Sequence, residues 1–399
     1  MQLALPGSPH LTYCTNIHAG ERWNDIEAAL RIHLPAIKRR VSPTNPMGVG
    51  LRLSAAAAAD LAHPQALERL QAFLRHAGLY VFTVNAFPYG LFHGARVKEQ
   101  VYEPDWRHEQ RLAFSNRVAD VLARLLPDGM QGSISTVPGA YKAKVREPAD
   151  VAHVADLLLR HAAHLHIIAR ETGRQIVLAL EPEPCCFLET IDEAIDFFEQ
   201  HLFSGTAVAA FRRLTGLPAT WARDALRRHL GICLDVCHVT VEFENPTECV
   251  ARLAAAGIRV PKIQLSSALK VPAVSDGVVE LLRPFDDGIY LHQTVEAREG
   301  RLRATPDLPD AFAALRRGAA GGEWRVHCHV PLFQSDYGGL QSTQEPLAEL
   351  LAACRKQALA PHLEVETYTW GVLPAHSKGV DVDNDIAREL TWVRSQLGA

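Results

Sequence analysis

Short apolar runs alternate with longer amphipathic stretches along the whole chain. Between the short runs, segments such as 66–78, 108–127 and 148–173 repeat apolar residues at helical spacing. Eight short runs, rich in β-branched and other apolar residues, have the length of buried strands. They cover residues 11–16, 47–54, 79–87, 132–137, 175–181, 230–236, 261–267 and 362–368. This order predicts repeated βα units around a parallel sheet.

Eight strand–helix units are the number that closes a TIM barrel, so we predict an α/β fold of the TIM (β/α)8 type. A doubly wound open sheet is the alternative, but no Gly-x-Gly-x-x-Gly phosphate signature follows the first predicted strand. At about 150 residues per domain, the 399 residues suggest two or three domains. A barrel with insertions fills this length as one unit, and we therefore predict a single domain over residues 1–399.

The gap between the seventh and eighth predicted strands is much longer than the others and predicts an insertion at about residues 271–340. It contains three apolar segments, at 289–297, 301–308 and 324–333, with a glycine turn between the first two. We predict a β-hairpin and an extra strand here. In a TIM barrel, an insertion at this point lies at the C-terminal mouth, over the active site.

Composition limits the classes of protein to consider. Apolar residues make up 48% and charged residues 22% of the chain, which is typical of a globular protein and excludes a disordered or collagen-like one. The net charge is −4, so we expect no nucleic-acid partner, since gripping a phosphate backbone needs a basic face. Eight cysteines in 399 residues are too sparse for a disulfide scaffold, and the absence of a Cys-x-x-Cys pair argues against a structural zinc knot.

The sequence carries no signature of a membrane protein or of export. No stretch approaches the roughly 18 uninterrupted apolar residues of a transmembrane helix, so we expect no membrane span. The first ten residues, MQLALPGSPH, lack both the basic start and the long apolar core of a secretory signal. We expect a cytoplasmic protein.

Polar side chains end the last four predicted strands, at Glu181, Asp235, Gln264 and Glu366. A single carboxylate at a strand end is often only the N-cap of the next helix. Here four consecutive strands deliver an oxygen to the same end of the barrel, and facing carboxylates repel unless a cation neutralises them or they share protons. One divalent metal is the simplest resolution. Oxygen ligands suit Mg²⁺ or Mn²⁺, and nearby histidines leave Zn²⁺ or Co²⁺ open.

In this order, Glu181, the run Leu-Asp235-Val-Cys-His238, Gln264 and Glu366-Thr resemble the xylose-isomerase-like TIM barrels. That superfamily contains sugar isomerases and epimerases as well as endonuclease IV. The resemblance implies that Glu181, Asp235 and Glu366 bind one metal ion and that His238 lies near the substrate. Gln264 stands where most members have a histidine ligand, and its amide oxygen still suits a hard cation.

Three further segments resemble the EboE family of metabolite traffic proteins, the TIM-barrel component of the ebo gene cluster. They are LTYCTNIHAGERWND at 11–25, LEPEP at 180–184 and HLEVETYTW at 362–370. This resemblance implies a small-molecule partner in a secondary-metabolite pathway and leaves the reaction undefined.

Other polar residues are candidate substrate contacts. His327 and His329 are two apart in a run that we expect to be a strand, so both side chains should face one way. A half-exposed strand of the insertion is the alternative explanation for this pair. Asn85 ends the third predicted strand, His18 follows the first, and Glu183 follows the fifth, so we expect all three near the mouth.

Strand parity predicts a second, deeper layer of charge. Lys262 lies two residues before Gln264, and Glu364 lies two residues before Glu366. If Gln264 and Glu366 point into the barrel, Lys262 and Glu364 do so as well. Because an unpaired buried charge is costly, we predict an ion pair between Lys262 and Glu364 inside the barrel. Glu366, nearer the mouth, is then the metal ligand.

Three functions remain open from the sequence. The first is a metal-dependent isomerase or epimerase on a sugar or related hydroxy-carbonyl metabolite, in which Glu181 and Glu366 remove and return a proton. The second is a metabolite-binding protein without turnover, suggested by Gln264. The third and least favoured is an endonuclease IV-like phosphodiesterase, because Arg52 and Asn85 stand where that chemistry would need histidines. A homo-oligomer also stays open, since related barrels are often dimers or tetramers.

Overall fold

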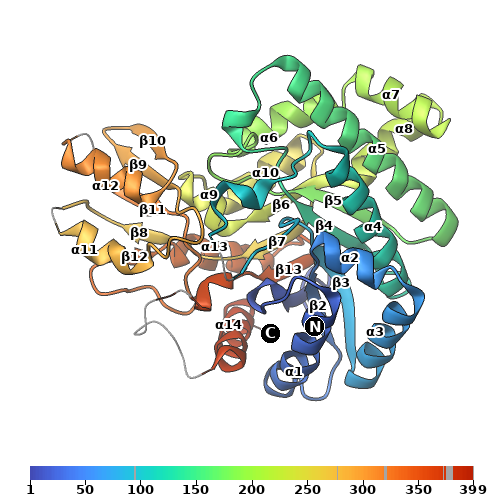
Figure 1. Ribbon diagram of the computed structural model, residues 1–399, viewed down its shortest axis with the longest axis horizontal. Coiled ribbons are helices and arrows are strands. Elements are labelled where there is room, and N and C mark those ends of the chain that lie inside the picture. Colours follow the sequence, from blue (N-terminus) through green and yellow to red (C-terminus); the bar gives the residue numbers. More distant parts are fainter. Residues whose placement is uncertain (94–95, 276, 319–320, 372, 374–380, 399) are drawn as a thin grey trace.

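The computed structural model describes residues 1–93, 96–275, 277–318, 321–371, 373 and 381–398. A parallel sheet of eight strands, in the order β1-β13-β7-β6-β5-β4-β3-β2, forms a barrel (Figure 1). A β-bridge between Cys14 and Gly50 joins the two ends of this order. The prediction of a TIM barrel is therefore confirmed. Its strands are β1 (His10–Tyr13), β2 (Met47–Arg52), β3 (Leu79–Asn85), β4 (Gly132–Thr136), β5 (Ile176–Leu180), β6 (Leu230–Asp235), β7 (Arg259–Leu265) and β13 (His362–Val365).

Helices cover the outside of the barrel (Figure 1). The predicted segment at 148–173 forms α5, which begins with a capping box between Glu147 and Asp150 and ends at Gly173, whose φ is +72°. Among the described helices, none is both long and apolar enough to cross a membrane. The helices are α1 (Trp23–Val41), α2 (Ala55–Leu61), α3 (Pro64–Ala77), α4 (Glu109–Leu125), α5 (Pro148–Thr172), α6 (Ile191–Phe197), α7 (Gly205–Thr215), α8 (Ala219–His229), α9 (Val236–Val241), α10 (Pro246–Ala255), α11 (Val278–Leu282), α12 (Leu308–Arg316), α13 (Gln344–Cys354) and α14 (Val382–Leu397).

The barrel interior contains the predicted charged layer. Lys262 on β7 and Glu364 on β13 form an ion pair, and both side chains are fully buried. The Lys262 ammonium also donates to Ser135 Oγ at 3.2 Å. Glycine at position 50 is required because a Cβ there would lie 2.0 Å from Glu364 Oε1. The predicted ion pair and the strand register on which it depends are confirmed.

The insertion forms a sheet of its own beside the barrel (Figure 1, orange). Its strands follow the order β10-β9-β11-β8-β12 and pair antiparallel. They pack with α11 and α12 around an apolar cluster that includes Trp324, Leu269 and Phe312. The bounds are β8 (Leu269–Val271), β9 (Thr294–Arg298), β10 (Arg301–Thr305), β11 (Glu323–Val326) and β12 (Gln341–Ser342).

The strand expected over residues 324–333 is wrong in its second half. Strand β11 ends at Val326, and the segment that carries His327 and His329 is irregular backbone. The Val330 backbone amide donates to Ser267 O, just beyond β7, rather than continuing the antiparallel ladder. The backbone therefore turns after Val326 and carries His327 and His329 away from the inserted sheet and toward the barrel.

Candidate functional site

Three carboxylates meet at the C-terminal end of the barrel. Glu181 follows β5, Asp235 ends β6 and Glu366 follows β13. Each can offer an oxygen within 4.8 Å of the oxygens of the other two. All three side chains are buried. The structure therefore brings together three of the four predicted metal ligands.

One oxygen of Asp235 is fixed by donors. Asp235 Oδ1 accepts from the Ser266 hydroxyl at 2.6 Å and from the His238 backbone amide at 3.1 Å. The second contact makes Asp235 the N-cap of α9, so the cap and the site residue are the same side chain. The other oxygen, Oδ2, is buried without a hydrogen-bond partner among the described residues.

Glu366 is held in the same way. Its Oε1 accepts from Asn16 Nδ2 at 2.7 Å and from Asn85 Nδ2 at 3.0 Å. Its Oε2 has no partner in the described structure, and neither has Glu181 Oε2. Buried polar atoms without a partner are rare and costly. Three neighbouring carboxylates with such oxygens could hold a cation between them.

The electrostatics of this group point the same way. Burial raises the pKa of Glu181 well above its usual range, and the charges of Glu366 and Asp235 raise it further. Burial and the charge of Asp235 likewise raise the pKa of Glu366. Two of the three carboxylates therefore resist ionisation together unless a cation lies among them.

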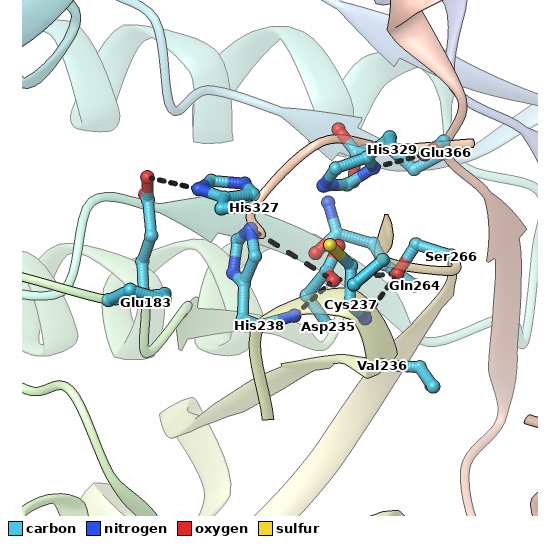
Figure 2. Close-up of polar contacts among 12 residues, drawn as sticks. Glu183, Asp235, Val236, Cys237, His238, Gln264, Ser266, His327, His329 and Glu366 are labelled. Atoms are coloured by element: carbon cyan, nitrogen blue, oxygen red, sulfur yellow. Dashed lines mark hydrogen bonds and ion pairs between the residues drawn. The ribbon is translucent and has the colours of Figure 1, made fainter. Parts of the chain in front are cut away.

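Three histidines stand beside the carboxylates, with ring centroids 4.6 Å apart for His238 and His327 and 5.4 Å apart for His327 and His329 (Figure 2). His238 Nδ1 lies 3.0 Å from the Pro182 carbonyl oxygen, and His329 Nδ1 contacts the Glu366 carbonyl oxygen. A carbonyl oxygen only accepts, so Nδ1 carries the proton in both rings and Nε2 has a lone pair. Burial lowers the pKa of His238 to about 4, which keeps this ring neutral.

The three histidines, together with Glu181 and Glu366, line a cavity of about 60 Å³. Its polar wall contains many hydrogen-bond acceptors, and several of its hydrogen-bond donors are already bonded to other side chains of the protein. The Asn16 and Asn85 amides donate to Glu366, and Lys98 is paired with Asp307 at 2.6 Å. A cation and a ligand rich in hydroxyl groups would complement such a wall. Its lining includes Asn16, Asn85, Phe87, Phe92, Lys98, Tyr102, Glu181, Glu183, His238, Tyr290, His327, His329, Glu366 and Tyr368.

Glu183 lies at the edge of this group. Tyr102 donates to Glu183 Oε1 at 2.7 Å, and His327 Nδ1 lies 3.6 Å from the same oxygen. Burial raises the pKa of Glu183 to about 8, although the Tyr102 hydrogen bond opposes the shift. The predicted substrate contacts Glu183, His238, His327, His329 and Asn85 all line the cavity.

No family model and no curated protein matches the sequence. Among solved structures, D-psicose 3-epimerase with D-tagatose from Clostridium cellulolyticum H10 superposes with a TM-score of 0.50 at 12% identity, over 98% of this chain and 99% of that one. The chain shares the TIM-barrel fold of this epimerase. Two further matches each cover 98% of both chains. They are a xylose isomerase domain protein from Planctomyces limnophilus (TM-score 0.49, 15% identity) and the IolI protein with a bound zinc atom (0.48, 12%).

Identities this low establish the fold and nothing finer. The resemblance to the EboE family, the cytoplasmic location and the oligomeric state stay predictions. The roles given to the site residues also rest on the geometry of this chain alone.

Gln264 departs from the expected arrangement of this barrel. It lies opposite Asp235 in the register of β6 and β7. Its Oε1 accepts from the Cys233 thiol at 2.9 Å, and it does not line the cavity. The amide oxygen is therefore engaged by a thiol, and Gln264 Nε2 is buried without a hydrogen-bond partner among the described residues. The role of Gln264 as fourth ligand stays a prediction.

His18 lies away from the cavity wall. Its ring stacks on His33 at 4.1 Å, and its Nε2 lies 2.9 Å from the Tyr13 hydroxyl. Arg52, on β2, pairs with Glu21 at 2.9 Å and does not line the cavity.

Sequence reasoning missed the contributions of Lys98, Tyr102, Tyr290 and Gln293. All four lie in the loop after β3 or in the inserted segment before β9. No hydrophobic period or strand end marks such positions. A motif search based on strand ends could therefore not find them.

Proposed function

We propose that this chain is a divalent-metal-dependent isomerase or epimerase acting on a sugar or related hydroxy-carbonyl metabolite. The observation that carries the proposal is the meeting of three buried carboxylates at Glu181, Asp235 and Glu366, each with one oxygen that has no hydrogen-bond partner in the part of the chain that the structure describes. These residues would hold the metal. A bound divalent ion would supply Lewis acidity, polarising the carbonyl and neighbouring hydroxyl oxygens of the substrate.

The residues of this chain would carry out the proton transfer. Glu181 and Glu366 stand at the ends of β5 and β13, which other strands separate in both directions around the barrel. One would remove a proton from the carbon next to the carbonyl, and the other would return it. The Nε2 lone pairs of His238 and His329 would accept hydroxyl protons and orient the substrate. Similarity in fold to a D-psicose 3-epimerase supports this class of reaction.

Metal content tests the first half of the proposal. The full chain, purified without a histidine tag and loaded with Mn²⁺, Co²⁺ or Zn²⁺, should retain one ion per chain after desalting. The double variant Glu181→Gln/Glu366→Gln should retain none. Glu183→Gln is the matched control, since this buried carboxylate is bonded to Tyr102 and should leave the stoichiometry unchanged. Retention by the double variant would refute the assignment of the ligands.

Deuterium incorporation tests the second half. Incubating the metal-loaded protein in D₂O with a panel of ketoses and aldoses should place deuterium on the carbon next to the carbonyl of the substrate. The exchange should disappear in Glu181→Gln.

A second candidate function is metabolite binding without turnover, in a secondary-metabolite pathway. The contact between Gln264 and the Cys233 thiol supports it, because the amide is then not a metal ligand. This alternative predicts that a sugar raises the melting temperature of the protein while no deuterium enters its carbon skeleton.

A further inference from the structure

Gln293 joins three segments around the cavity. It lies in the insertion, just before β9, and is fully buried. Its Nε2 donates to the Pro184 carbonyl oxygen at 3.1 Å and to the Tyr102 hydroxyl at 2.9 Å. Its Oε1 lies 2.7 Å from His327 Nδ1. One side chain therefore connects the insertion to the loops after β3 and β5.

The direction of these hydrogen bonds follows from one fixed acceptor. The Pro184 carbonyl oxygen can only accept, so the amide nitrogen of Gln293 must face it. The amide oxygen must then face His327, which requires the proton on Nδ1. His327 Nε2 is left with a lone pair, and this atom is buried with no partner in the described structure.

The other branch of the network is fixed by the same amide. Because Tyr102 accepts from Gln293, its own proton is free to donate to Glu183 Oε1, 2.7 Å away. The orientation of Gln293 therefore sets both the acceptor atom of His327 and the hydroxyl that donates to Glu183. The backbone supports it as well, since the His327 amide donates to the Gln293 carbonyl oxygen at 2.8 Å.

We infer that Gln293 is a positioning residue, which holds His327 in the tautomer whose Nε2 accepts a hydroxyl proton from a polyhydroxylated ligand. The role given to His327 in ligand binding rests on the proposed function. His327 would be the third histidine of the cavity with a fixed tautomer, after His238 and His329, whose Nδ1 atoms face backbone carbonyl oxygens. The insertion would thereby contribute to ligand recognition. Gln293 itself does not touch the ligand.

The tautomer can be measured directly. We would label the histidines of the full-length protein with ¹⁵N, remove metal with a chelator and record long-range ¹H–¹⁵N spectra. The His327→Gln variant identifies the signals of His327. The wild-type spectrum should show His327 protonated on Nδ1, and Gln293→Met should move the proton to Nε2 or mix the two forms. Tyr102→Phe is the matched control, because it leaves the contact of Gln293 with Pro184 and should keep the Nδ1 proton.

Either an Nε2 proton in wild-type protein or an unchanged tautomer in Gln293→Met would overturn the inference. The wild-type spectrum is decisive even if Gln293→Met fails to fold. Titration with xylitol, sorbitol and inositol should shift the His327 Nε2 signal in wild-type protein for at least one polyol. Failure of all three would overturn the ligand-recognition role. The tautomer spectra need no metal, so a failure of the proposed metal site would be seen separately.

Discussion

The buried ion pair inside the barrel gives the sharpest stability prediction. Lys262→Met removes the cation while keeping an unbranched apolar side chain of similar length. Glu364 then stays buried, with no donor within hydrogen-bonding geometry among the described residues. Removing one partner of such a pair costs about 3–5 kcal/mol, because the other charge is left uncompensated in the interior. We therefore expect the free energy of unfolding to fall by about 3–5 kcal/mol.

Urea unfolding of the metal-free protein measures this loss. The double variant Lys262→Met/Glu364→Gln should regain most of it, since no uncompensated charge remains. Lys270→Met is the matched control. Its ammonium is partly exposed and 3.9 Å from Glu323, so its loss should cost about 1 kcal/mol or less. The reasoning is refuted if Lys262→Met costs no more than Lys270→Met, or if the double variant is as unstable as the single one.

Three further predictions concern the site and its surroundings. Asn16→Ala removes a donor to Glu366 and should weaken metal binding about 10- to 100-fold in a chelator competition, and unchanged affinity would contradict the role of Asn16. Gln264→His should tighten Zn²⁺ binding in the same assay, because imidazole suits zinc better than an amide does. Burial raises the pKa of Glu389 to about 7, so its protonated form stabilises the fold, and Glu389 should contribute about 3 kcal/mol to the fall in the free energy of unfolding as the pH rises from about 4.5 to 7. The fall in Glu389→Gln should be smaller than in wild type by about this amount, and an equal fall in the two proteins would exclude a contribution from Glu389.

Much of the barrel could be predicted from sequence because its strands are buried on both faces. Such strands are nearly continuous apolar runs, which makes them recognisable without knowledge of their partners. Parity within a strand then predicted the pair between Lys262 and Glu364, because side chains two residues apart in a strand lie on the same face. The segment around His327 escaped prediction, because its apolar alternation continues past the point where the backbone leaves the sheet.

The candidate site likewise contains residues that the sequence predicts and residues that it does not. Glu181, Asp235 and Glu366 end predicted strands, so the barrel geometry alone brings them together. Tyr102 and Gln293 reach the cavity from long loops, whose paths depend on tertiary contacts that no local pattern encodes. The directions of the hydrogen bonds were also beyond the sequence, because they follow from carbonyl groups of residues distant in the chain.

The separate apolar core of the inserted sheet has a consequence for how this protein can change over evolution. Among the described residues, the insertion reaches the cavity through two short segments, 290–291 and 327–329, while strand β10 is largely exposed. Substitutions in β10 therefore leave both the barrel and the carboxylates untouched. Under the proposed function, substitutions near Gln293 and His327 change ligand recognition, and they lie outside the barrel strands. Selection can act on ligand preference and on barrel stability through different residues.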